Sequence, residues 1–427
     1  MMIVIMMTVF CGWGCVIEVV YSRIKIKSLT CEKSVMISIA LAGKPNSGKS
    51  TFFKAATMAD VEIANYPFTT IDANHGIAHL RVECPCKELQ LEDCRSCRDG
   101  VRFLPLELID VAGLVPDAHK GRGLGNAFLD HLSRADAIIH VIDASGMTDI
   151  EGNPIGRGEH DPLEDIGFLE REIDMWILGI LQRNWKRISK KGGIERIPIE
   201  RIIAEQLGGV GVDERDVRTA LSRLELGEKP ETWSEDELLR VVEEIRRLKK
   251  PIIIAANKVD IAPEENIKKL EELDRDVIFL SSAAELALMT AAKTGVITYL
   301  PGDRGFRVIG RGLSEAQRRA LERLESFVER NNGTGLQECV NRVVFDLLEK
   351  IVVYPVEDEN RCSDKNGRVL PDAFIVDRSC TTRELAYKVH TEIGDSFLFG
   401  IDARTRMRIG ERHVLKDGDV IKIASVK

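Results

Sequence analysis

The residues best suited to chemistry lie between Met36 and Thr51, in the sequence MISIALAGKPNSGKST. The spacing Gly43-x4-Gly48-Lys49-Ser50 is the phosphate-loop pattern, placed between an apolar run and a helical one. Two glycines allow successive backbone N–H groups to face phosphate oxygens. Lys49 is expected to reach the β- and γ-phosphates, and Ser50 to bind Mg²⁺, at the positive end of the following helix. This pattern predicts a nucleoside triphosphate site rather than a chance glycine-rich loop. The residues expected to contact the nucleotide here are Gly43, Lys44, Pro45, Asn46, Ser47, Gly48, Lys49, Ser50 and Thr51.

A second segment, ANYPFTTI, follows after a short interval and carries two adjacent hydroxyls. Pro67 favours an extended backbone before it, which suits a surface loop. In such a loop Thr70 would be a second hydroxyl ligand of Mg²⁺, offered only when the γ-phosphate is present. Phe68 and Thr69 complete the predicted contact segment.

A strand predicted at Leu104–Ile109 ends in Asp110-Val111-Ala112-Gly113. Asp110 can hold Mg²⁺ through water, and the N–H of Gly113 can bind the γ-phosphate. All four residues, Asp110, Val111, Ala112 and Gly113, are predicted nucleotide contacts.

The base is expected to be read by Asn257-Lys258-Val259-Asp260, which follows a predicted strand at Pro251–Ala256. The Asp260 carboxylate can accept both the N1–H and the N2 amine of guanine, an edge that adenine lacks. Lys258 is expected to lie along the base plane. A backbone N–H within Ser282-Ala283-Ala284 can meet guanine O6.

These polar segments must be positioned by the buried strands that precede them. Apolar runs alternate with helical patterns, which predicts an α/β fold with a mostly parallel sheet, as in P-loop NTPases. The 427 residues predict about two or three domains. We expect a first part of the nucleotide domain at 36–150, a helical insertion at 151–250 that forms an antiparallel hairpin, the rest of the nucleotide domain with connecting helices at 251–350, and a β-rich module at 351–427.

Two local features are also predicted. Ser234 followed by Glu237 has the form of an N-terminal capping box, and Gly335–Ile351 is expected to be a helix.

Composition narrows the class of protein. The chain is 44% hydrophobic and 30% charged with a formal charge of −8, which excludes a chain-wide nucleic-acid coat. Residues 1–17 carry no charged side chain and are rich in Met, Ile and Val. They suggest a membrane anchor, a signal peptide, or a start-site artefact in which Met36 is the true start. The third interpretation for residues 1–35 is preferred, with a cytoplasmic protein and no stable membrane association expected.

Four of the ten cysteines are clustered: Cys84, Cys86, Cys94 and Cys97. The C-x-C and C-x-x-C pairs can hold tetrahedral Zn²⁺, although their seven-residue spacer is short for a zinc ribbon. Free thiols in an insert, or a redox-sensitive pair, are the alternatives that the sequence leaves open.

Taken together, these motifs resemble the Obg superfamily of P-loop GTPases, in its YchF (Obg-like ATPase) branch of archaeal type. The matching stretches are GKPNSGKST, NYPFTTI, DVAGLVPDAHKGRGLGN, HVIDASG, NKVD and SSAAE, and the ending DGDVIKI is similar to a TGS domain, a β-grasp unit. The resemblance implies a Ras-like G domain that binds GTP and GDP, and action with the ribosome or RNA.

Two details of the resemblance bear on chemistry. Many YchF proteins lack the base-reading Lys and Asp and prefer ATP, whereas Lys258 and Asp260 are present here. Ras-like enzymes carry a water-positioning Gln after their DxxG motif, and this chain has Leu114, which cannot orient water. His119 is a weaker candidate for that role. Asn46 either coordinates K⁺ beside the phosphates, as in several related GTPases, or stabilises the loop through hydrogen bonds.

Three functions follow from this reading. The first is a slow GTPase switch that acts on the ribosome or translation machinery. The second is an ATP-hydrolysing regulator in stress response, and the third is an RNA-binding protein in which nucleotide is structural.

Overall fold

The structure is a computed structural model that describes residues 36–58, 74–111, 113, 132, 134–227 and 229–426, with two short strands near the N-terminus. The chain divides into two compact units, Met1–Val35 and Met36–Lys427. Strands β1 (Phe10–Cys11) and β2 (Cys15–Val16) pair antiparallel in the first unit. The described part of the chain has no helix that is long and apolar enough to cross a membrane.

The second unit is built on a six-stranded sheet in the order β4-β5-β3-β6-β7-β8. Only the β4–β5 pair is antiparallel among these strands, which confirms the predicted α/β fold with a mostly parallel sheet. Strand β4 was not predicted. The strands are β3 (Ser38–Ala42), β4 (His75–Glu83), β5 (Val101–Asp110), β6 (Ala137–Asp143), β7 (Ile252–Asn257) and β8 (Val277–Phe279).

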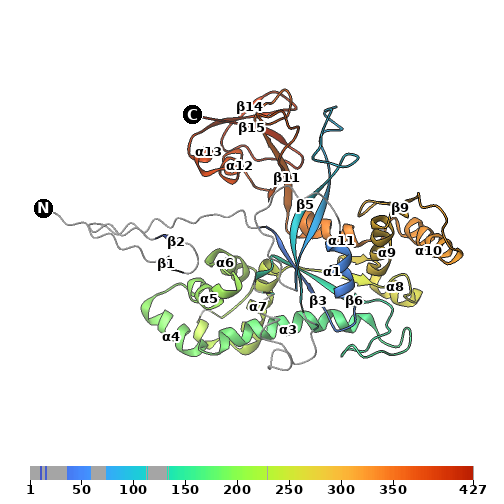
Figure 1. Cartoon of the computed structure of the whole chain (residues 1–427). Helices are drawn as coiled ribbons and strands as arrows, with labels where there is room; N and C mark the ends of the chain where they lie inside the picture. The colour runs from blue at the N-terminus through green and yellow to red at the C-terminus, as the bar shows by residue number, and fades with distance from the viewer. Residues whose placement is uncertain are drawn as a thin grey trace. The chain divides into compact units, whose positions relative to one another are not determined.

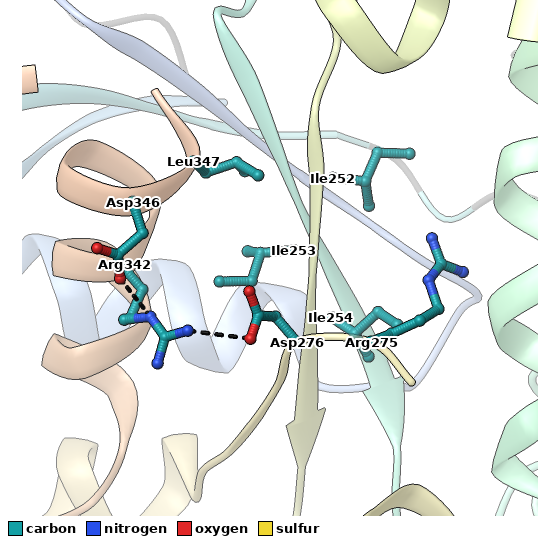
Figure 2. A pocket seen from close by; sticks show the side chains of 8 residues that line it. All are labelled: Ile252, Ile253, Ile254, Arg275, Asp276, Arg342, Asp346 and Leu347. Carbon is teal, nitrogen blue, oxygen red and sulfur yellow. Dashed lines mark hydrogen bonds and ion pairs between the residues drawn. The ribbon is translucent and has the colours of Figure 1, made fainter. Parts of the chain in front are cut away.

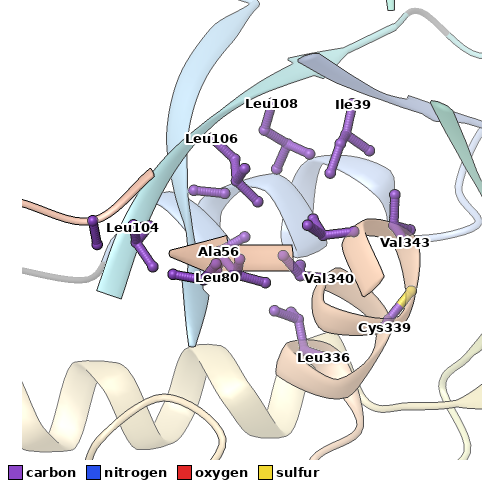
Figure 3. Close-up of a cluster of buried hydrophobic side chains, with 14 of the residues drawn as sticks. Ile39, Ala56, Leu80, Leu104, Leu106, Leu108, Leu336, Cys339, Val340 and Val343 are labelled. Carbon is purple, nitrogen blue, oxygen red and sulfur yellow. The ribbon is translucent and has the colours of Figure 1, made fainter. Parts of the chain in front are cut away.

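Alternate residues of β3 face two separate cores, because successive side chains of a strand point to opposite faces. Ile39 and Leu41 pack in one core with residues of α1 (Lys49–Thr57) and α11 (Leu336–Arg342). Figure 3 shows this layer, with side chains of β5 lying above those of α11. Ala40 and Ala42 pack in the other core with the helical insertion. Helices therefore cover both faces of the sheet (Figure 1).

The insertion between β6 and β7 is larger than the helical hairpin that the sequence predicted. Three shorter helices lie between the two long ones in the described residues, and together they form one apolar core. The capping box predicted at Ser234 and Glu237 is present, with the Ser234 hydroxyl accepting from the Glu237 N–H at 3.2 Å. The helices are α3 (Pro162–Gln182), α4 (Trp185–Glu195), α5 (Ile199–Leu207), η2 (Gly208–Val210), α6 (Glu214–Ser222), η3 (Pro230–Thr232) and α7 (Glu235–Lys249).

After β7 the chain adds helices and a small ribbon before the C-terminal module. These elements are α8 (Glu264–Glu271), α9 (Ser282–Lys293), β9 (Ile297–Thr298), β10 (Arg307–Val308), α10 (Glu315–Asn331) and the π-helix η4 (Val343–Leu347). The helix predicted at Gly335–Ile351 was too long, because strand β11 begins at Lys350. The run from Ile351 to Tyr354 alternates between two cores, as a strand requires.

The C-terminal module is a five-stranded sheet in the order β12-β11-β15-β13-β14, with β11 and β15 parallel. A helix packs on it, in the manner of a β-grasp unit, and Leu385 of this helix is fully buried. The elements are β11 (Lys350–Val356), β12 (Phe374–Asp377), α12 (Thr382–Val389), α13 (Thr391–Asp395), β13 (Phe397–Asp402), β14 (Arg408–Ile409) and β15 (Val420–Ser425).

Candidate nucleotide-binding site

The phosphate loop joins β3 to α1 and lies directly against β6 and β7. Gly43 and Gly48 have φ values of 144° and 101°, which residues with a side chain rarely adopt. A Cβ atom added to Gly43 would lie 2.3 Å from the Val141 carbonyl oxygen, and one added to Gly48 would lie 2.1 Å from Nδ2 of Asn257. Both glycines are therefore required by backbone conformation and by space.

The Lys49 ammonium lies inside the loop. Its Nζ donates to the carbonyl oxygens of Gly43 at 3.0 Å and Lys44 at 2.8 Å. Burial lowers the pKa of Lys49 to about 8, and the nearby Asp110 carboxylate opposes this shift. An anion held by the loop would favour the charged form of Lys49, because opposite charges stabilise each other at short range.

The neighbouring Lys44 points away from the loop and ties it to the helical insertion. Its side chain is fully buried, and Nζ donates to the Thr148 carbonyl at 2.8 Å and pairs with Asp165 of α3 at 3.0 Å. His160 contacts the same Asp165 carboxylate at 2.8 Å. Burial raises the pKa of Asp165, although Lys44 opposes the shift. Lys44 thus contributes to the loop through its backbone, while its side chain supports the fold.

Asn257 connects the phosphate loop to Ser282-Ala283-Ala284, the second segment predicted to contact the base. Its side chain is 2% exposed, Nδ2 donates to the Ser47 carbonyl at 2.9 Å, and Oδ1 accepts from the Ser282 N–H at 3.0 Å. Both ends of the amide are used within the protein. Asn257 therefore positions the neighbouring residues that are predicted to contact the nucleotide.

Lys258 also reaches the loop, with Nζ donating to the Asn46 carbonyl at 2.8 Å and to Asp143 at 2.9 Å. Asp143 is fully buried at the end of β6 and accepts from the Ser145 and Thr148 hydroxyls. Burial would raise the pKa of Asp143, but these hydrogen bonds and Lys258 lower it, so the carboxylate is charged. Sequence reasoning missed Asp143, although a polar residue at the carboxyl end of a buried strand was a usable signal.

Two groups near this segment are left for a ligand. The Asp260 carboxylate is exposed and, among the described residues, has no hydrogen bond or ion pair. Ala283 is exposed in the first turn of α9, where backbone N–H groups lack helical partners. The N–H of Ser282 binds Asn257 and that of Ala284 binds the Ser281 hydroxyl at 3.1 Å. Of the three predicted residues, Ala283 is the one with an available N–H.

Oxygen ligands suited to Mg²⁺ lie beside the loop. Ser50 is exposed in the first turn of α1, and Asp110 ends β5, directly opposite Leu41 of β3. Hydroxyl and carboxylate oxygens are the ligands that this ion prefers. A Cβ added to Gly113 would lie 2.8 Å from the backbone nitrogen of Pro45, so the DxxG segment contacts the phosphate loop. The predicted contacts Phe68, Thr69, Thr70 and Ala112, together with Leu114 and His119, lie outside the described residues.

Two further features lie away from this site. Cys84, Cys86, Cys94 and Cys97 bring their sulfur atoms within 4.8 Å of one another at the tip of the β4–β5 hairpin. Figure 2 shows a pocket at the first half of β7, where Arg342 pairs with Asp276 at 3.0 Å. The phosphate loop is at the other end of the strand, so we assign the pocket no part in nucleotide binding.

One basic segment that could contact nucleic acid is Arg183–Lys191, at the start of α4. Its Trp185 is 4% exposed and stacks on Trp233, with ring centroids 5.7 Å apart. Trp185 therefore belongs to the core of the insertion and is not available to stack on a base.

Family comparisons divide the chain into three matched regions. Residues 38–167 match a family described as 50S ribosome-binding GTPase, and residues 255–358 match the G4 motif-containing domain of Obg-like GTPase YGR210-like proteins. Residues 367–425 match the TGS domain.

Individual relatives match across most of the chain. A protein of Methanocaldococcus jannaschii named uncharacterized GTP-binding protein MJ1332 is 49% identical, over 91% of this chain and 99% of its own length. The crystal structure of a GTP-binding protein from Pyrococcus horikoshii is 43% identical, covers 91% of this chain and 100% of that chain, and has a TM-score of 0.73. The ribosome-binding ATPase YchF of Bacillus subtilis is 34% identical, over 55% of this chain and 62% of its own length.

We expect Asn257→Ala to weaken GDP and GTP binding equally, because it releases both the phosphate loop and the Ser282 segment. Loss of two buried hydrogen bonds should also lower the free energy of unfolding by roughly 2–4 kcal/mol. Titration with a fluorescent guanine nucleotide and denaturant unfolding without nucleotide measure the two effects.

Asn266→Ala is the matched control, since this buried amide donates to the Ala144 carbonyl and touches no loop residue. It should cost stability but retain nucleotide affinity. Unchanged affinity in Asn257→Ala would contradict the positioning role of Asn257.

Proposed function

Since this chain belongs to the YchF/Obg-like family of P-loop GTPases, we propose that it binds GTP and hydrolyses it slowly, as a switch that acts with the ribosome. The proposal rests on how the side chains of the predicted base-reading motif, Asn257 to Asp260, are arranged. Asn257 and Lys258 are fixed against the phosphate loop, while the Asp260 carboxylate is exposed and unpaired among the described residues.

Guanine is the base that this arrangement fits. A carboxylate accepts hydrogen bonds and donates none, so Asp260 suits the two donors on guanine and not the adenine edge. The N–H of Ala283 is free to donate to guanine O6. Some relatives carry the name ATPase, and an ATP-hydrolysing regulator is the alternative function. The presence of both Lys258 and Asp260 favours GTP.

In the proposed reaction Lys49 would contact the β- and γ-phosphates, and Ser50, Thr70 and Asp110 would hold Mg²⁺. The ion would neutralise charge that develops on the phosphates during transfer. The N–H of Gly113 would bind the γ-phosphate, which is supported by the position of Gly113 against Pro45 of the phosphate loop. Leu114 cannot position the attacking water, and His119 is the proposed candidate for that role. Turnover is expected to be slow because the water-positioning Gln of Ras-like enzymes is replaced by Leu114.

Asn46 is the proposed ligand of K⁺ beside the phosphates. Its Nδ2 donates to the Gly152 carbonyl at 3.0 Å, which supports the alternative that Asn46 stabilises the loop. The Oδ1 atom has no partner in the described part of the chain, and an amide oxygen suits a weakly hydrated cation. The two roles are compatible, because they use different atoms of one side chain.

The ribosome is the proposed partner, and the proposed location of the protein is therefore the cytoplasm. The matched family is described as ribosome-binding, and relatives named YchF carry the same description. The TGS domain would give the switch a second surface for contact with its partner, in addition to the surface of the G domain. An RNA-binding protein with structural nucleotide is the remaining alternative, and a measured hydrolysis rate separates it from an enzyme.

Asp260→Asn tests the choice of nucleotide. The variant should bind GTP roughly 100-fold more weakly, because it loses hydrogen bonds from guanine to a charged acceptor. It should gain affinity for xanthosine triphosphate, whose 2-oxo group accepts from the new amide. Competition titrations with GTP, ATP and xanthosine triphosphate measure this.

Asp274→Asn makes the same change of charge at an exposed position before β8, and it should leave all three affinities unaltered. Equal affinity of the wild-type protein for GTP and ATP would refute the guanine assignment.

A second test compares hydrolysis in KCl and NaCl at matched ionic strength. If Asn46 binds K⁺, turnover should be about tenfold faster in KCl, equivalent to about 1.4 kcal/mol of barrier. Asn46→Ala should abolish the difference with little loss of GDP affinity, whereas Asn366→Ala, an exposed asparagine of the C-terminal domain, should preserve it. Identical rates in the two salts would remove the potassium role.

A further inference from the structure

The four clustered thiols have the spacing of a metal site. The sulfur atoms of Cys84 and Cys94 are 3.8 Å apart, those of Cys86 and Cys97 are 3.5 Å apart, and all four lie within 4.8 Å of one another. Four sulfurs at about 2.3 Å from a central zinc ion would be separated by roughly 3.8 Å in a tetrahedron. A disulfide needs about 2.05 Å, and none of these cysteines forms one.

The segment that carries the thiols has little else to hold its shape. Residues 84–100 contain no helix or extended strand, apart from an isolated bridge between Arg98 and Val101. Gln90, Asp93 and Asp99 have positive φ values of 52°, 57° and 50°. Connections of this length without regular structure are uncommon in compact domains unless they are functional. A central cross-link would account for the ordered path of this segment.

The same segment forms the contact with the C-terminal domain. Glu88 receives two hydrogen bonds from Arg404, at 3.0 and 2.9 Å, in a paired geometry that gives strong ion pairs. Beside the tip of the hairpin, at the start of β5, buried Arg102 donates to the Leu370 carbonyl at 2.7 Å and the Pro371 carbonyl at 3.0 Å.

Apolar contacts join the two parts as well. Cys84 and Cys86 are 3% and 5% exposed and pack in the same core as Tyr354 and Leu370 of the C-terminal region. The Tyr354 ring also lies 5.5 Å from the Arg102 guanidinium. The thiol cluster is therefore placed beneath the surface on which the C-terminal domain docks.

We propose that Cys84, Cys86, Cys94 and Cys97 bind one Zn²⁺ in a closed four-thiolate site, and that this site maintains the docking surface for the C-terminal domain. Four protein ligands leave no open position, so the ion has a structural role. The site lies far from the reacting phosphates of the proposed GTPase, because the ten residues of β5 place it roughly 30 Å from Asp110.

Metal content is the first measurement. Full-length protein purified without chelator should carry about one equivalent of zinc, as a four-ligand site requires. Replacement by Co²⁺ should give the visible absorption of a tetrahedral thiolate site, a readout that needs no variant. Cys94→Ser should lose the metal, and Cys380→Ala, which removes a buried thiol of the C-terminal core, should retain it.

Docking is the second measurement. Chelation of the wild-type metal should speed amide hydrogen exchange in residues 84–100 and 362–373 but leave β13 protected. Arg404→Ala should speed exchange at the docking surface while the zinc is retained, which separates the contact from the metal. The proposal is overturned if the purified wild-type protein is free of metal and its four thiols titrate freely or form two disulfides. It is also overturned if chelation does not change the rate of amide hydrogen exchange in residues 84–100 and 362–373. GTP hydrolysis is measured in the same samples, so a failure of the zinc site is distinguished from a failure of the GTPase assignment.

Discussion

The buried amide of Asn257 is the interaction on which the rest of the site depends. It holds the Ser47 carbonyl on one side and the Ser282 N–H on the other, and it occupies the space that a side chain at Gly48 would need. The phosphate loop and the proposed base-reading segment are therefore parts of a single packed unit. A change in either segment must be accommodated by the other, because close-packed interiors leave few voids.

The helical insertion is attached to this unit and is not a peripheral addition. Lys44 is buried between the Thr148 carbonyl and Asp165 of α3, so an ion pair joins the phosphate loop to the insertion. Breaking a buried pair leaves an uncompensated charge, which costs about 3–5 kcal/mol. The arrangement couples the orientation of α3 to the loop, through a residue of the phosphate-loop pattern itself.

Sequence reasoning reached the fold class and the nucleotide motifs, because glycine spacing and apolar strands are local signals. It did not find β4, whose pairing with β5 is a long-range contact, and it extended the helix at Gly335–Ile351 across the start of β11. It named Lys258 as a base contact but could not see that Asp143 and the Asn46 carbonyl hold its ammonium. Hydrogen-bond partners that lie far apart in the chain cannot be predicted from the periodic pattern of apolar residues. The spacing of the four cysteines could be read from the sequence, but their position beneath the C-terminal domain is known only from the structure.

The β4–β5 hairpin has a mechanical consequence. Its pairing runs without a register shift from His75 opposite Ile109 to Glu83 opposite Val101. Sliding one strand by a single residue would turn every buried side chain to the wrong face, so the ribbon cannot shear. A change in the tilt of β5 at Asp110 would therefore be carried along the hairpin to the cysteine segment. The hairpin is roughly 30 Å long, and the C-terminal domain contacts its far end through Arg102 and Glu88, so a small rotation at one end becomes a larger translation at the other.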